Sequence, residues 1–192
     1  MKIPVAKALF NSHSYSEYRK LVSDLLLEGK STGNEQSEDL IHYTTLNETR
    51  MNRLDKTIKI TDENSRKLKS LDTEYIWLVI SEGWCGDAAQ LLPIINKMAL
   101  QSDNIDLRIV LRDENEELMN FFLTNKSKAI SILIFVDKNF YRVIFPVIAQ
   151  CIACAIVEAV IGNIKQQVEI VFIPERFILA GVIRCAWVRL GA

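Results

Sequence analysis

A run of six consecutive apolar residues, Tyr75 to Ile80, constrains the fold of this chain more than any other feature. A strand that is apolar on both faces must be covered on both sides, which is typical of the central strands of α/β sheets. The run leads through the turn Ser81 to Ala88 into a segment, Ala88 to Leu100, whose apolar residues recur at helical spacing. The sequence therefore predicts a buried strand, a turn and a helix in direct succession.

Two further strands are predicted in the same half of the chain, over Ile105 to Leu111 and Ile132 to Val136, with a helix capped by Asp113 between them. Alternating strands and helices indicate an α/β domain, a central mixed sheet flanked by helices. The first two strands should be parallel, since the helix between them forms a crossover of the usual right-handed kind.

The chain before about Leu71 is polar and helical in pattern. We predict one helix from Ser14 or Ser16 through Glu28, a second from Ser37 to about Lys56, and a short third after the cap-like Thr61. These helices divide the chain into a helical extension, residues 1–71, and an α/β domain, residues 72–192.

The part of that domain beyond about residue 140 is atypical, because it is more apolar than usual and has no clear period. A strand over Tyr141 to Ile148, a helix around Cys151 to Ile164 and a strand over Val168 to Ile173 are the predicted elements. Two explanations stay open for this segment: a variation confined to one lineage, or the product of a shifted reading frame.

Charge and hydropathy exclude several partners. The net charge is −1, from 23 basic and 24 acidic residues, so the chain has no overall field that attracts nucleic acid or an anionic membrane. The stretch Val143 to Val157 is interrupted by Pro146 and Gln150 and is too short to span a bilayer. The first ten residues lack the apolar core of a secretory signal, so we expect a cytoplasmic location, no membrane contact and reduced cysteines.

The turn Trp84-Cys85-Gly86-Asp87-Ala88 carries the main candidate for chemistry. A thiol between a buried strand and a helix lies at the helix N-terminus, where unpaired N–H groups and the helix dipole favour the thiolate. Trp84 would shield one side of the sulfur, and Gly86 would let a partner backbone approach. Asp87 adds a negative charge that opposes thiolate formation, which leaves the direction of the pKa shift open.

The turn resembles that of the thioredoxin superfamily, whose hallmark is Trp-Cys-Gly-Pro-Cys after a central strand. The segments Tyr15 to Tyr18, Gly33 to Ser37 and Arg50 to Thr57 also resemble uncharacterised bacterial thioredoxin-family proteins with a helical extension. The resemblance implies a thioredoxin-like fold with Cys85 in the catalytic position. Asp87 replaces the proline and Ala88 replaces the resolving cysteine, so a two-thiol reductase cycle cannot close within this turn.

The family also places a cis-proline opposite the catalytic sulfur. In this sequence Lys128-Ala129-Ile130-Ser131-Ile132 matches that place, with Ser131 in the proline position. A cis bond before serine costs about 2.5–4 kcal/mol, so we expect a trans bond, or dense packing around a cis one.

Two functions from different classes fit these features. The first is monothiol exchange, in which an accessible Cys85 attacks a disulfide and glutathione or a protein thiol resolves the product. The alternative is a non-catalytic thioredoxin-fold module that binds partners or stabilises its host, and oxidation of Cys85 to a sulfenic acid is a third reading. No cofactor is expected. The pair Cys151 and Cys154 has redox or metal spacing, but its apolar neighbours favour structural cysteines and no metal.

Overall fold

The structure is a computed structural model that describes residues 2–124, 126–137 and 142–148. Within these ranges the elements follow in the order α1 (Lys2–Phe10), α2 (Tyr15–Leu27), α3 (Glu38–Thr57), α4 (Asp62–Lys69), β1 (Tyr75–Ser81), α5 (Gly86–Ala99), β2 (Ile105–Leu111), α6 (Glu116–Met119), β3 (Ile132–Asp137) and β4 (Arg142–Ile148). The helix predicted around residues 151–164 and the strand predicted over 168–173 lie outside the described residues.

The described strands form one mixed sheet in the order β2-β1-β3-β4. β1 and β2 run parallel, with Tyr75 opposite Ile105 and Ser81 opposite Leu111. β3 runs antiparallel to both β1 and β4. The predicted α/β class, the central mixed sheet and the parallel first pair are therefore confirmed.

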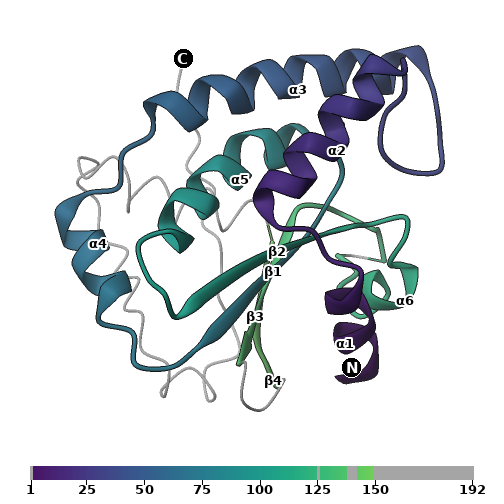
Figure 1. The fold of residues 1–192 in the computed structure, drawn as a ribbon. Coiled ribbons are helices and arrows are strands. Elements are labelled where there is room, and N and C mark those ends of the chain that lie inside the picture. The colour runs from purple at the N-terminus through teal and green to yellow at the C-terminus, as the bar shows by residue number, and fades with distance from the viewer. Residues whose placement is uncertain (1, 125, 138–141, 149–192) are drawn as a thin grey trace, which may run out of the picture.

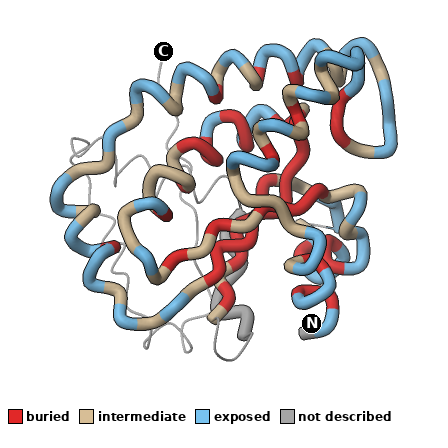
Figure 2. The backbone as a smooth tube through the Cα atoms, viewed as in Figure 1, coloured by how far each residue is buried: buried red, intermediate tan, exposed pale blue. Residues whose placement is uncertain are grey.

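Helices cover both faces of the sheet (Figure 1), with α2, α3 and α5 on one side and α1 and α6 on the other. Alternate residues of β1 serve the two layers: Trp77 and Val79 pack with α2, α3 and α5, whereas Leu78 and Ile80 pack with α1 and α6. The buried residues run along the strands and the inner side of α5 (Figure 2). Such two-sided burial explains why β1 is continuously apolar.

Local capping explains where the N-terminal helices begin. Ser14 accepts a hydrogen bond from the N–H of Glu17, whose side chain bonds back to Ser14, so α2 starts with a complete capping box. The hydroxyls of Ser37 and Thr61 cap α3 and α4 by each accepting a hydrogen bond from a backbone N–H of the first turn. All three predicted helices are thus present, and α1, which the sequence did not reveal, precedes them.

The prediction of a helix capped by Asp113 is wrong about both the cap and the length of the helix. α6 is only four residues long, and its N-cap, Asn115, makes no side-chain capping bond. The Asp113 carboxylate instead accepts hydrogen bonds from Nε of Arg112, at 2.7 Å, and from the backbone N–H of Asn34, at 3.1 Å. Because the Asp113 carboxylate bonds to the distant loop at Asn34, it does not cap the helix.

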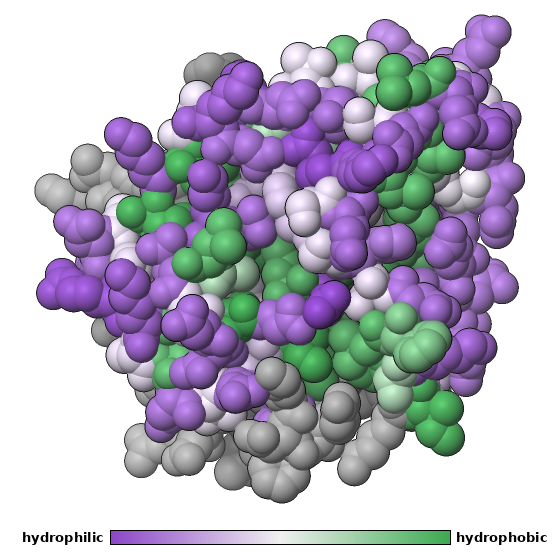
Figure 3. Space-filling model, viewed as in Figure 1, coloured by the Kyte–Doolittle hydropathy of each residue, from purple (hydrophilic) through white to green (hydrophobic). Residues whose placement is uncertain are grey.

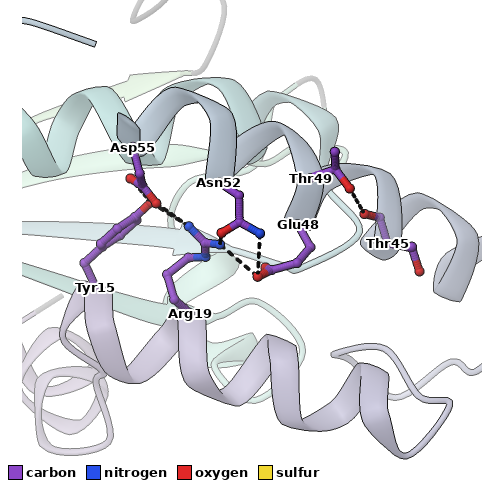
Figure 4. Close-up of polar contacts among 7 residues, drawn as sticks. All are labelled: Tyr15, Arg19, Thr45, Glu48, Thr49, Asn52 and Asp55. Carbon is purple, nitrogen blue, oxygen red and sulfur yellow. Dashed lines mark hydrogen bonds and ion pairs between the residues drawn. The ribbon is translucent and has the colours of Figure 1, made fainter. Parts of the chain in front are cut away.

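A cluster of charged and polar residues joins α2 to α3 (Figure 4), with Arg19 at its centre. The guanidinium donates to Asp55, to Glu48 at 2.9 Å and to Asn52 at 2.8 Å, and the Tyr15 hydroxyl donates to Asp55. We call these five residues the Arg19 cluster. α3 in turn packs along α5, so the cluster fixes the outer helices over the strand-to-helix turn.

The outer surface of this helical layer is polar. Over α2 and α3, most side chains on the face seen in Figure 3 are hydrophilic. No helix in the described part of the chain is both long and apolar enough to cross a bilayer.

Candidate functional site

Cys85 is the N-cap residue of α5, as the sequence predicted. Its Sγ lies 3.6 Å from the carbonyl oxygen of Ile130 and 3.8 Å from the hydroxyl of Ser131. The residue is only 7% exposed, so the expectation of an accessible thiol is wrong for this structure. The reason is that Cys85 belongs to the core beside Tyr18 and Met51, two residues of the N-terminal helices.

Opposing effects act on the Cys85 thiol. Burial raises its pKa, while the N–H groups of Ala88 and Asp87 and the hydroxyl of Ser131 lower it, and the charge of Asp87 raises it; the net direction is upward. The helix N-terminus therefore favours the thiolate as expected, but desolvation is the larger effect. The thiol is protonated at neutral pH, because an unperturbed thiol already titrates at about 8.5.

The bond between Ile130 and Ser131 is cis, so the expectation of a trans bond is wrong. Ser131 is almost fully buried, and its hydroxyl lies 3.3 Å from that of Ser81 at the end of β1. The expectation rested on the preference of an isolated peptide bond, whereas here the surrounding β1 and Cys85 turn decide the backbone path.

The remaining residues predicted to shape the site gather around Cys85. Trp84 is half-buried, with the Arg112 guanidinium 4.8 Å from its ring centre, within cation–π range. Gly86 and Asp87 are exposed, and Ala88 is buried one turn into α5. The position of the missing resolving cysteine is therefore filled by a methyl group in the core.

Residues from the N-terminal part of the chain hold the turn. The N–H of Gly83 donates to Oγ1 of Thr32 at 2.7 Å, and Nδ2 of Asn47 donates to the Gly83 carbonyl at 3.0 Å. Arg50 donates to Oδ1 of Asn47 at 3.0 Å, and its Nη1 lies 4.0 Å from the position that a Cβ on Gly86 would take. Sequence reasoning missed the contacts of Thr32 and Asn47, although the Gly33 and Arg50 segments that it singled out flank them.

Glu82, another residue that the sequence analysis missed, is fully buried beside the turn. Its Oε1 accepts the backbone N–H of Asp113 at 3.0 Å, whereas its Oε2 has no hydrogen-bond partner. Burial raises the pKa of this carboxyl group above its usual range. The signal in the sequence was a single acidic residue directly after a continuously apolar strand.

Gly33 lies near the Glu82 carboxylate and has a positive φ of +90°. A Cβ at this position would come within 2.8 Å of Oδ2 of Asp113, and within 3.5 Å of both Oε2 of Glu82 and Nε1 of Trp84. The absence of a side chain therefore lets the loop before α3 approach the turn.

Metal binding has no support among the described residues, since no three histidine, cysteine, aspartate or glutamate side chains meet there. Cys151, Cys154 and Cys185 lie outside the described residues. The described part of the site thus contains one thiol, and the hydrogen-bond donors around it favour its thiolate form.

Comparison with known proteins places the chain in a family. The chain has no match among curated proteins. A protein of unknown function from Pseudomonas aeruginosa has a similar structure, with a TM-score of 0.46 and 15% identity, over 76% of this chain and 88% of that one. An HIV epitope scaffold follows, with a TM-score of 0.45 and 17% identity, over 71% of this chain and 78% of that one. Neither similarity is high enough to carry an argument. The family model described as thioredoxin, in contrast, matches residues 33–160, more than half of the chain, and the protein belongs to the thioredoxin family.

Proposed function

We propose that this protein catalyses monothiol exchange at Cys85. The thiolate attacks one sulfur of a disulfide, forms a mixed disulfide with that half and releases the other half as a thiolate. A second thiolate, from glutathione or a protein thiol, then attacks the mixed disulfide and regenerates the Cys85 thiolate. The external thiol supplies the two electrons and the substrate disulfide accepts them, so no cofactor is needed.

The observation that carries the proposal is the set of hydrogen-bond donors around a sulfur without a resolving neighbour. The N–H groups of Asp87 and Ala88 and the hydroxyl of Ser131 favour the charged sulfur. Ala88 supplies no second thiol, so a captured partner has to be released by an external one. Because burial raises the thiol pKa, the exchange should be slow at neutral pH and faster in alkaline solution.

A non-catalytic binding module is the second candidate, and the same burial favours it. A thiol that is 7% exposed and has a raised pKa is a weak nucleophile toward a large substrate. In that case the Cys85 turn would serve packing alone, and partners would use another surface.

The direct test is removal of glutathione from a glutathionylated model peptide in the presence of reduced glutathione. The proposal expects turnover above the rate of glutathione alone, and loss of all turnover in Cys85→Ser. Reduction of insulin should stay at background, because that reaction needs two thiols in one site. Equal rates for the wild-type protein and Cys85→Ser would favour the binding module.

Ala88→Cys should supply the resolving thiol that the turn lacks. A thiol one helical turn from Cys85 can attack the mixed disulfide from within, so insulin reduction should rise well above the wild-type background. Ala89→Cys is the matched control, since Ala89 is also buried in the first turn of α5 but does not occupy the resolving position. Equal insulin reduction by the two variants would contradict a specific role of position 88.

A further inference from the structure

Cys85 stands at the end of a row of buried hydroxyl groups that comes from three separate parts of the chain. Tyr18 belongs to α2, Ser81 ends β1, and Ser131 directly precedes β3. Each of these three residues is at most 1% exposed. The Ser81 and Ser131 hydroxyls are 3.3 Å apart, and the Ser131 hydroxyl is 3.8 Å from the sulfur. We call these three residues the hydroxyl row.

The far end of the row is the hydroxyl of Tyr18. The fully buried Tyr18 hydroxyl interacts with Ser81, which lowers the tyrosine pKa, but no acceptor stands at full hydrogen-bond distance and angle to it. Burial raises the pKa of Tyr18, so its hydroxyl keeps its proton. A buried hydroxyl without a well-aligned acceptor is costly, and Ser81, the next residue of the row, is the hydroxyl with which Tyr18 interacts.

Ile130 and Ser131, the two residues next to the sulfur, interact differently with the protonated thiol and with the thiolate. A protonated thiol can donate to the Ile130 carbonyl, 3.6 Å away, whereas a thiolate has nothing to donate. A thiolate is instead an acceptor for the Ser131 hydroxyl. The Ser81 hydroxyl has two acceptors within reach, the Glu82 carbonyl at 3.5 Å and the Ser131 hydroxyl at 3.3 Å. When Tyr18 donates to Ser81 and Ser81 donates to Ser131, the last hydroxyl is free to donate to sulfur, and each bond polarises the next.

We propose that Ser131 is a further residue of the exchange reaction, which stabilises the Cys85 thiolate by a hydrogen bond that Ser81 and Tyr18 support. The inference rests on the proposed function, because the sulfur carries this charge when it attacks and when it leaves. Ser131 touches the reacting atom, while Ser81 and Tyr18 are positioning residues. A proline at position 131, which the family resemblance implies, could not donate this bond.

Other charges near the sulfur act from different elements. The charge of Asp87 on α5 raises the pKa of the thiol, and Nη1 of Arg50 on α3 lies 4.0 Å from the position that a Cβ on Gly86 would take. Lys128, before β3, is paired with Glu116. None of them is altered by substitutions in the hydroxyl row, so those substitutions isolate the contribution of the hydroxyls.

The test is the rate of iodoacetamide alkylation at Cys85, followed across alkaline and neutral pH in the full chain. Mass spectrometry of the Cys85 peptide separates this thiol from the other three. Ser131→Ala should slow the reaction about three- to tenfold at neutral pH and move the profile to higher pH, as expected for loss of one charge-assisted bond. Ser81→Ala should give a smaller shift in the same direction, and Tyr18→Phe the smallest.

Two variants separate this role from a structural one. Ser131→Thr keeps the hydroxyl and should keep the wild-type profile. Ser31→Ala removes another buried serine hydroxyl, which bonds to Thr44 at 2.7 Å, and should leave the profile unchanged. If Ser131→Ala does not fold, the order of Ser81→Ala and Tyr18→Phe decides: upward shifts support the inference, and unshifted profiles overturn it.

The alkylation assay needs no exchange activity, so the two proposals fail in different ways. Overlapping profiles for the wild-type protein and Ser131→Ala would overturn the inference even if the wild-type protein exchanges glutathione. A shifted Ser131→Ala profile in a protein that does not exchange would support the hydrogen bond and remove the proposed function.

Discussion

The Arg19 cluster and the Cys85 turn both withdraw ionisable groups from water, and they do so with opposite results. Burial lowers the pKa of Arg19, but hydrogen bonds and electrostatic interactions with Glu48 and Tyr15 together raise it by more, so Arg19 stays charged. At the turn, burial raises the pKa values of Glu82 and Cys85, and the nearby donors do not reverse it. A charged partner, rather than the degree of burial, decides which groups keep their charge.

The opposite pKa shifts reflect different roles of the Arg19 cluster and the Cys85 turn. The Arg19 cluster pairs charges between α2 and α3 and stabilises the position of these helices. The turn beneath them holds a thiol and a carboxyl group that would be more stable in water. Unfavourable groups of this kind are expected at functional sites and have to be compensated elsewhere in the fold.

Arg19→Ala should have the largest effect, because it leaves Glu48 and Asp55 without their cation while only 21% and 30% exposed. We expect a loss of about 3 kcal/mol in the free energy of unfolding, measured in urea. Arg108→Ala is the control, since Arg108 pairs with Asp106 at a more exposed site and should cost about 0.5 kcal/mol. Similar losses of unfolding free energy in both variants would contradict a special stabilising role of the Arg19 cluster.

Gly33→Ala should cost about 2 kcal/mol, from positive φ and from contact of the new methyl group with the Asp113 carboxylate. Gly29→Ala shares the positive φ but has nothing within 4 Å of the new Cβ, so it should cost about 1 kcal/mol. The difference between the two urea midpoints measures the close approach of the loop to the turn. No difference would contradict that approach.

Glu82→Gln should give a smaller effect of the opposite sign. Because the pKa of Glu82 is raised in the folded state, the folded protein keeps a proton that the unfolded chain releases above about 4.3. Stability from this group is present at low pH and falls as pH rises through the folded pKa. The neutral amide removes this fall, so Glu82→Gln should be more stable than the wild-type protein by about 1 kcal/mol at neutral pH.

The matched control is Glu117→Gln, at an exposed site paired only with Lys7, which should leave the pH dependence of unfolding unchanged. If Glu82→Gln is destabilised at neutral pH, the carboxylate is charged and paired in the folded protein, and the contrast with the Arg19 cluster disappears.

The apolar run of β1 and the turn after it predicted the sheet and the position of Cys85, because strand burial and a helix N-terminus are local properties. The burial of Cys85 could not be predicted, since it depends on Tyr18 and Met51, both more than thirty residues away in the chain. The same holds for Thr32 and Asn47, whose roles arise only when the outer helices meet Gly83. The cis bond before Ser131 likewise reflects the tertiary context rather than the local preference.

The most direct test of the central claim is the pH dependence of mixed-disulfide formation between Cys85 and oxidised glutathione in the folded protein. Mass spectrometry of the Cys85 peptide would give the rate at each pH. We predict an adduct at Cys85 that forms slowly at neutral pH and faster as the pH rises above the range in which an ordinary thiol titrates, because burial raises the pKa of a thiol that still has donors around it. An adduct that forms only after urea unfolds the chain, and at no pH in the folded protein, would contradict exchange at Cys85.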